Sequence, residues 1–296
     1  MKLTSFICLL VILLAQGCTM RAPLGHDKGY IRMGKDSIYY ESTRPGTKSE
    51  TVLLLHAGFL NTEMWRKQVP EFSRSYYTVA IDIPGHGRSG NDTNRLRPSD
   101  FIKAVMDSLH ISKASIIGVS LGASCVTDFI IAHPERVNKA ILVASGLNGW
   151  EKKFAFDTTI NEYISSFFDA LEIHDTVKAA EIFTRVWFDG PYRSPAQVND
   201  SARKYIYNTT LDNMRKHHVR GWPIFDEPPA IDRLSGIKMP VLVIHGDKDM
   251  PLITRTCTYI EQNIRGAKRV LIPGVGHMLN MENPAKFNEI VLDFLK

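Results

Sequence analysis

Short apolar runs alternate with helical patterns along most of the chain. The runs at 51–56 and 114–119 are continuously apolar, which is typical of strands buried on both faces of a sheet. The full set of strand candidates is 37–40, 51–56, 78–82, 114–119, 139–143, 241–245 and 268–272. The helical patterns lie at 63–72, 98–110, 121–133, 252–263 and 284–296. This alternation predicts an α/β fold with a largely parallel sheet, helices on both faces, and functional groups beyond the carboxyl ends of the strands.

The alternation stops between residues 146 and 232, where no buried strand is predicted. Aromatic residues recur there at helical spacing, namely Phe154, Phe156, Tyr163, Phe167, Phe168, Trp187 and Phe188. Turn signals occur at Gly190-Pro191 and Pro228-Pro229. We predict an all-helical insertion over 147–232, between core segments at 29–146 and 233–296. Most of these aromatic residues should form the core of the insertion, and a minority should face a cleft.

The first residues of the chain follow the three-part pattern of a secretory signal. Lys2 precedes an apolar run at 6–15, and small residues follow that run. The run is about half of the roughly 20 residues that a membrane-spanning helix needs, so a permanent transmembrane helix is the weaker interpretation. We therefore expect residues 1–17 to be a signal peptide.

The stretch LAQGC at 14–18 resembles a bacterial lipobox. The resemblance implies cleavage before Cys18 and lipid modification of that cysteine, with residues 18–28 as a short tether. Acyl chains at Cys18 would hold the protein on a membrane surface. We therefore expect an exported protein, lipid-anchored to the bacterial cell envelope on its periplasmic or outer-membrane face. An ordinary signal with an unrelated cysteine is the alternative.

Composition narrows the range of partners. The formal net charge is +5, but the basic residues are scattered, so we predict no nucleic-acid partner. Cys8 and Cys18 fall in the N-terminal segment, and we expect Cys125 and Cys257 to be buried free thiols. No Cys or His pair has metal-ligand spacing, and neither a P-loop nor a strand–GxGxxG–helix motif occurs, so we predict no metal and no cofactor.

A GxSxG motif, GVSLG at 118–122, lies between a predicted buried strand and a predicted helix. In that context the motif predicts a sharp turn that exposes the hydroxyl of Ser120 above the sheet. Bulkier residues in place of the two glycines would clash with the neighbouring strand and helix. Because a serine hydroxyl is a weak nucleophile at neutral pH, Ser120 needs an adjacent base.

That base should be a histidine on a loop after the last strand, and we predict His277 in GVGHM at 274–278. The rivals His56, His86 and His245 all precede the last strand, and His217 and His218 are expected to form a solvated surface of the insertion. A carboxylate must fix the imidazole tautomer. Asp247 and Asp249 both follow a buried strand between Ser120 and His277, and both are available. We predict Asp249 as the acid, and we expect Asp247 to be a turn residue that binds backbone N–H groups.

Two backbone amides should form an oxyanion hole. The N–H of Leu121 lies at the start of the predicted helix, beside Ser120. A second donor is expected after the early strand, in HAGF at 56–59, where a glycine lets an amide approach the substrate oxygen. We assign this role to Gly58, with Phe59 as its nearest rival.

These motifs resemble those of the α/β-hydrolase superfamily of serine hydrolases with a helical cap, in its esterase, lactonase and carbon–carbon hydrolase branch. The matching stretches are LLLHAGFLNTEMW, AIDIPGHGRSG, GVSLGA, VIHGDKD and GVGHMLNMENP, and the order Ser120, Asp249, His277 is the superfamily's order. The resemblance implies an α/β-hydrolase fold from about residue 30 onward. Ala57 stands where relatives usually carry glycine, and the resemblance gives His86 and Arg88 a structural role.

The leading functional hypothesis is hydrolysis of a small-molecule carboxylic ester or lactone through an acyl-enzyme at Ser120. Carbon–carbon bond hydrolysis, or perhydrolase and acyltransferase activity, would use the same three residues. Haloalkane dehalogenases and epoxide hydrolases are disfavoured, since they carry Asp at the position of Ser120. A non-catalytic ligand-binding sensor on the same fold is the alternative from another class.

Overall fold

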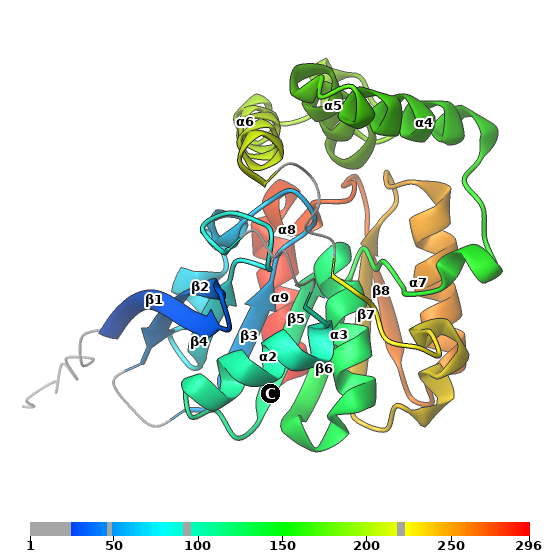
Figure 1. Ribbon diagram of the computed structural model, residues 1–296. Helices are drawn as coiled ribbons and strands as arrows, with labels where there is room; N and C mark the ends of the chain where they lie inside the picture. The colour runs from blue at the N-terminus through cyan, green and yellow to red at the C-terminus, as the bar shows by residue number, and fades with distance from the viewer. Residues whose placement is uncertain (1–24, 46–48, 91–95, 218–222) are drawn as a thin grey trace, which may run out of the picture.

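The computed structural model describes residues 25–45, 49–90, 96–217 and 223–296 (Figure 1). The predicted signal peptide, the lipidation site at Cys18 and His218 lie outside these residues. Within the described part of the chain, no helix has the length and apolar character that crossing a membrane requires.

An eight-stranded sheet forms the centre of the molecule, in the order β1-β2-β4-β3-β5-β6-β7-β8. Its strands are β1 Gly25–Met33, β2 Asp36–Arg44, β3 Thr51–Leu55, β4 Tyr77–Ile81, β5 Ala114–Val119, β6 Val137–Val143, β7 Val241–Gly246 and β8 Lys268–Ile272. β2 is antiparallel to both β1 and β4, and every other pair is parallel. The predicted α/β-hydrolase fold is therefore confirmed.

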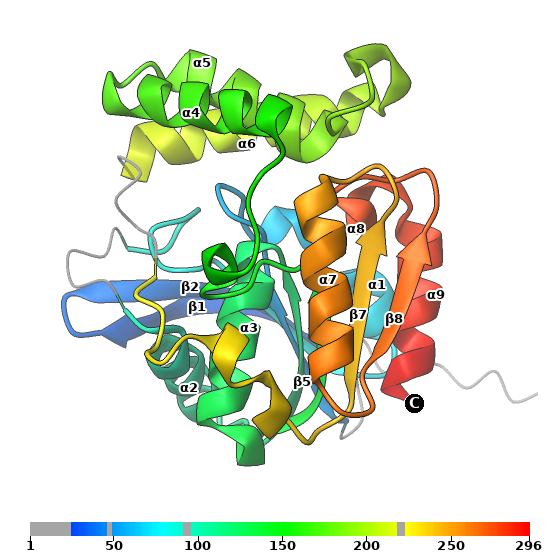
Figure 2. The ribbon, with the colours of Figure 1, turned by 90° about the vertical axis from the view of Figure 1, so that its right-hand side faces the viewer.

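Helices cover both faces of this sheet, which explains why the central strands read as continuous apolar runs (Figures 1 and 2). Every residue of β3, β4 and β5 is buried. One face carries α2 Pro98–Ser108, α3 Leu121–Ala132 and α7 Pro251–Asn263, and the other carries α1 Val69–Phe72 and α9 Pro284–Leu295. Cys125 and Cys257 are free and buried in this core.

A separate layer of three helices lies over the carboxyl ends of the strands, and we call it the cap (Figures 1 and 2). It consists of α4 Thr158–Glu172, α5 Thr176–Phe183 and α6 Asp200–His217. A π-helix, η4 Thr184–Asp189, and a 3₁₀-helix, η5 Pro195–Gln197, connect α5 to α6. In α4 the residues Ile160, Ile164 and Phe167 are buried. These apolar side chains recur at helical spacing, so they form one face of the helix that packs against the rest of the molecule.

The structure corrects two details at the edge of the fold. β1 begins at Gly25, so residues 25–28 are paired in the sheet instead of belonging to the tether. The helix expected at 63–72 is divided into a 3₁₀-helix, η1 Thr62–Trp65, and the short α1, which begins with Val69-Pro70. Proline at the second position of a helix is favourable, because its missing N–H would have had no partner there.

Candidate active site

The turn between β5 and α3 holds Ser120 in a strained backbone conformation, with φ 54° and ψ −112°. Both motif glycines are required by close packing. A Cβ atom on Gly122 would lie 2.5 Å from the carbonyl oxygen of Leu55 in β3. A Cβ atom on Gly118 would overlap the backbone of Gly122. The packing that makes the turn sharp therefore tolerates no side chain at positions 118 and 122, two residues before and two residues after the serine.

Asp249 and His277 meet above the carboxyl ends of β7 and β8. Nδ1 of His277 lies 2.8 Å from Oδ2 of Asp249, and both side chains are only 1% exposed. The other oxygen of Asp249 accepts a hydrogen bond of 2.7 Å from the N–H of Met250. Because a carboxylate only accepts hydrogen bonds, Nδ1 carries the proton in this pair. Nε2 of neutral His277 is then the basic nitrogen.

Nε2 of His277 is buried and has no hydrogen-bond partner among the described residues. Its hydrogen bond to the hydroxyl of Ser120 is consequently not formed in this structure. Hydrogen bonds between a nucleophile and its base are often long without substrate and tighten in the substrate complex. Ser120 and Met278, the residue next to His277, line the same cavity of about 440 Å³. The structure thus places the nucleophile candidate and the histidine loop at one cavity.

The predicted oxyanion donors line this cavity as well, since Gly58, Phe59 and Leu121 all contribute to its wall. Leu121 is the first residue of α3, where a backbone N–H has no acceptor one turn earlier in the helix. Phe59 has a positive φ of 59°, which is uncommon for an aromatic residue. The loop at 57–59 therefore has an unusual backbone conformation at Phe59, as expected of a loop that points an amide at the substrate.

Asn213 of the cap helix α6 holds this loop from above, a role that the sequence did not predict. Its Nδ2 donates a hydrogen bond of 2.9 Å to the carbonyl oxygen of Phe59. Its Oδ1 accepts a hydrogen bond of 2.6 Å from the N–H of Gly87. The sequence predicted only that Asn213 lies in a helical insertion, and this gives no indication of its partners.

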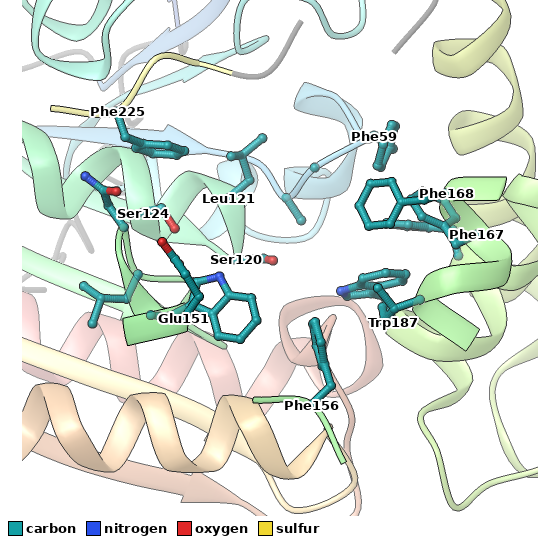
Figure 3. Close-up of a pocket in the computed structure, with 18 of the residues that line it drawn as sticks. Phe59, Ser120, Leu121, Ser124, Glu151, Phe156, Phe167, Phe168, Trp187 and Phe225 are labelled. Carbon is teal, nitrogen blue, oxygen red and sulfur yellow. The ribbon is translucent and has the colours of Figure 1, made fainter. Parts of the chain in front are cut away.

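In the described part of the chain, eight aromatic side chains line the cavity. They are Phe59, Trp150, Phe156, Phe167, Phe168, Phe183, Trp187 and Phe225. Figure 3 shows Phe167, Phe168 and Trp187 of the cap opposite the turn that carries Ser120. The rings of Phe183 and Trp187 are stacked with their centroids 4.9 Å apart. Among the described lining residues there is no Lys, Arg or His, and Glu151 is the single ionisable one.

The competing histidines occupy structural positions. Nε2 of His56 accepts a hydrogen bond of 2.8 Å from the N–H of Ile83, and burial lowers the pKa of His56 to about 4. Burial and the neighbouring His56 lower the pKa of His86 to about 3. The expectation of a solvated surface at His217 is wrong, because this residue is buried. Its Nε2 lies 3.1 Å from the carbonyl oxygen of Gly87. Burial also lowers the pKa of His217.

Asp247 behaves as the turn residue that we expected, since its Oδ1 accepts a hydrogen bond of 2.6 Å from the N–H of Gly274. Asp82 likewise has a structural role, and it accepts hydrogen bonds from the N–H groups of Thr62 and Arg88. Over the ranges that the structure covers, no group of three or more His, Cys, Asp or Glu residues could hold a metal ion.

Comparison with known proteins gives a consistent set of relatives. The chain is 25% identical to the 2-hydroxy-6-oxononadienedioate/2-hydroxy-6-oxononatrienedioate hydrolase of Paraburkholderia phymatum, over 87% of this chain and 90% of that protein. It is 26% identical to the carboxylesterase YbfK of Bacillus subtilis, over 92% and 89% of the two chains.

Two solved structures illustrate the similarity in fold. An enol-lactonase from Burkholderia xenovorans matches with a TM-score of 0.76 and 20% identity, over 90% of this chain and 99% of the other. Est816, described as an N-acyl homoserine lactone degrading enzyme, matches with a TM-score of 0.72 and 21% identity, over 90% and 100%. The family model of the alpha/beta hydrolase fold matches residues 50–284. On this match the chain belongs to the alpha/beta hydrolase family.

Proposed function

We propose that this protein hydrolyses small-molecule carboxylic esters or lactones through an acyl-enzyme at Ser120. The observation that carries the proposal is the buried pair of Asp249 and His277, whose basic Nε2 is unpartnered among the described residues. The next residue, Met278, lines the same cavity as the strained Ser120. Acyl transfer requires a nucleophile, an oriented base and oxyanion donors, and the candidates for the nucleophile and the donors line one cavity beside the histidine loop.

The proposed reaction has two stages. Nε2 of His277 takes the proton of Ser120 as its hydroxyl attacks the substrate carbonyl, and Asp249 stabilises the resulting imidazolium. The N–H groups of Leu121 and Gly58 stabilise the oxyanion, each by about 3 kcal/mol. His277 then protonates the leaving alcohol. Water, deprotonated by His277, then attacks the acyl-enzyme. The bond to the oxygen of Ser120 breaks, His277 returns the proton to that oxygen, and the acid is released.

The cavity wall favours an uncharged, apolar substrate. Aromatic side chains provide large apolar contact surfaces, and no cation among the described lining residues could pair with a substrate carboxylate. The first relative above is named for a dioate, which carries two carboxylates. Glu151 would repel such a substrate. The lining therefore supports ester or lactone hydrolysis over carbon–carbon hydrolysis of a dianion, and acyl transfer to another nucleophile would use the same acyl-enzyme.

The test combines labelling and turnover. A fluorophosphonate probe should label the unmodified protein, and Ser120→Ala should abolish labelling and hydrolysis of p-nitrophenyl esters while it leaves thermal unfolding nearly unchanged. A ligand-binding sensor without an activated serine would not react with the probe. A series of p-nitrophenyl esters of increasing chain length would then define the acyl preference.

We also propose that the protein is exported and lipid-anchored through Cys18, as the pattern at 14–18 favours. Expression in a bacterium that processes lipoproteins, followed by fractionation, tests this proposal. The protein with the parent sequence should be recovered with membranes. Cys18→Ser should be recovered as soluble protein or as a precursor that is not processed. Equal distribution of the two proteins would refute the lipid anchor.

A further inference from the structure

A buried ion pair connects the cap to the loop that carries His277. Nη1 of Arg193, between η4 and η5, lies 2.5 Å from Oε2 of Glu282, and Nη2 lies 3.2 Å from Oε1. The two side chains are 9% and 7% exposed. Arg193 belongs to the cap, whereas Glu282 ends α8 Leu279–Glu282, directly after the His277 loop. The contact is therefore bidentate, and water is largely excluded from it.

The guanidinium of Arg193 also binds the backbone on both sides of this junction. Nε donates to the carbonyl oxygen of Asp189 at 2.6 Å, and Nη2 donates to that of Phe188 at 2.8 Å. Nη1 reaches the carbonyl oxygen of Gly274 at 3.5 Å. With the two bonds to Glu282, all five N–H groups of Arg193 have acceptors. A lysine at this position could not reproduce this planar arrangement.

Glu282 transmits the contact to the residue before the histidine. Its Oε1 accepts a hydrogen bond of 2.7 Å from the N–H of Gly276. A Cβ atom on Gly276 would lie 2.5 Å from Nη2 of Arg193, so a glycine is needed for the guanidinium to come this close. On its other side the histidine loop is bound to the loop that carries Asp249, which we call the acid loop. The N–H of Lys248 in the acid loop donates a hydrogen bond of 3.0 Å to the carbonyl oxygen of Val275.

We propose that Arg193 and Glu282 are positioning residues for His277, a role that rests on the proposed hydrolase function. They hold the histidine loop between the cap and the acid loop, so that the imidazole keeps the orientation in which Nε2 can take the proton of Ser120. The same arginine is attached to the backbone of η4, which carries the cavity residue Trp187. The pair therefore fixes the base relative to the wall against which a substrate lies.

Stability alone does not require charges at this place, because replacement of a buried ion pair by apolar residues is often neutral or stabilising. What the pair supplies is a defined geometry between three backbone segments. A displacement of a catalytic group by about 1 Å can cost about 100-fold in rate. Loss of the pair should accordingly slow acylation of the serine more than it weakens substrate binding.

Arg193→Met and Arg203→Met are a matched pair of variants for the test. Arg203 is also a cap arginine in an ion pair. It binds Asp189 and Glu181, and none of its hydrogen bonds or ion pairs within the described part of the chain reaches the histidine loop. We expect Arg193→Met to lower kcat for p-nitrophenyl butyrate, and the rate of fluorophosphonate labelling, by about tenfold or more, with KM changed less than about threefold. Arg203→Met should keep both rates within about threefold.

Two further variants keep the test informative if Arg193→Met fails to fold. Glu282→Gln retains an oxygen for the N–H of Gly276 and should lose less activity than Glu282→Ala. Arg193→Lys should recover only part of the labelling rate. Equal labelling rates for the Arg193 and Arg203 variants, at a normal rate for the unmodified protein, would overturn the positioning role and leave the hydrolase function intact. Absence of labelling in the unmodified protein would overturn both.

Discussion

Asn213 in the cap donates its side-chain amide to the carbonyl oxygen of Phe59 at 2.9 Å, so the cap contacts the loop that is expected to stabilise the oxyanion. Asn213→Ala removes this bond and the acceptor for Gly87. We expect kcat for ester hydrolysis to fall about tenfold, because a preorganised amide donor stabilises the transition state only while its loop is fixed.

The matched control for this prediction is Thr210→Val, one turn earlier in α6. Thr210 is buried, and its hydroxyl has no partner among the described residues, so the substitution removes no hydrogen bond. Its kcat should stay within about twofold of the parent value. A similar fall in kcat for both variants would indicate a general effect on the cap and would refute a specific role for Asn213.

Asp249 and Asp247 can be distinguished by substitution with asparagine. Asp249→Asn should lower kcat by about 10³- to 10⁴-fold, because an amide favours the wrong imidazole tautomer and cannot stabilise the imidazolium. Asp247→Asn should change kcat by less than about tenfold, since Asp247 binds Gly274 and Lys248 in the turn. The reverse order of effects would assign the acid to Asp247.

The close packing around Gly122 predicts that a side chain at this position destabilises the protein. Gly122→Ala should lower the free energy of unfolding by about 3 kcal/mol, because its Cβ would overlap the backbone of Leu55. The control is Gly236→Ala, where nothing lies within 4 Å of the new Cβ atom. That variant should stay within about 1 kcal/mol of the parent in urea unfolding. Equal stability of the two variants would contradict the packing argument.

Stability should depend on pH through Asp128 of α3. Burial raises the pKa of Asp128 from 3.8 to about 7, although the N–H of Asp226 donates a hydrogen bond of 2.9 Å to it. Between these values the folded protein binds more protons than the unfolded chain, so stability falls as pH rises toward 7. An asparagine at position 128 cannot ionise, so Asp128→Asn should not lose stability in this way as pH rises.

From pH 5 to pH 8 the stability of Asp128→Asn relative to the parent should therefore increase by about 2.6 kcal/mol in urea unfolding. Asp107→Asn is the control, because ion pairs with Lys103 and Arg136 lower the pKa of Asp107, and its effect should stay constant over this range. A constant difference between parent and Asp128→Asn would show that Asp128 keeps its charge when folded.

The sequence predicted the central strands and the turn at Ser120, because both depend on local patterns. A continuous apolar run is typical of a strand that is buried on both faces of a sheet. The two glycines of GxSxG are required by close contacts that always occur at the same positions of this turn. β1 was not predicted, since it is a largely exposed edge strand without a continuous apolar run. Propensity and periodicity give little signal for such a strand.

Contacts between the cap and the core could not be predicted in the same way. Arg193 and Glu282 are separated by 89 residues, and nothing in the local sequence of either one identifies the other. His217 was misjudged for a related reason, because the polar end of α6 is buried only where it meets the turn at Gly87. Both results depend on the packing of whole elements, which a single sequence does not specify.

The attachment of the cap at two places has a consequence for protein engineering. Exchange of residues 147–232 for the cap of another family member would remove Asn213 and Arg193 together. The recipient core would keep Glu282 as a buried carboxylate without Arg193, and the carbonyl oxygen of Phe59 would lose the hydrogen bond from Asn213. A chimaera that is designed to change substrate preference should therefore transplant these contacts along with the helices, or its altered selectivity will come with a slower enzyme.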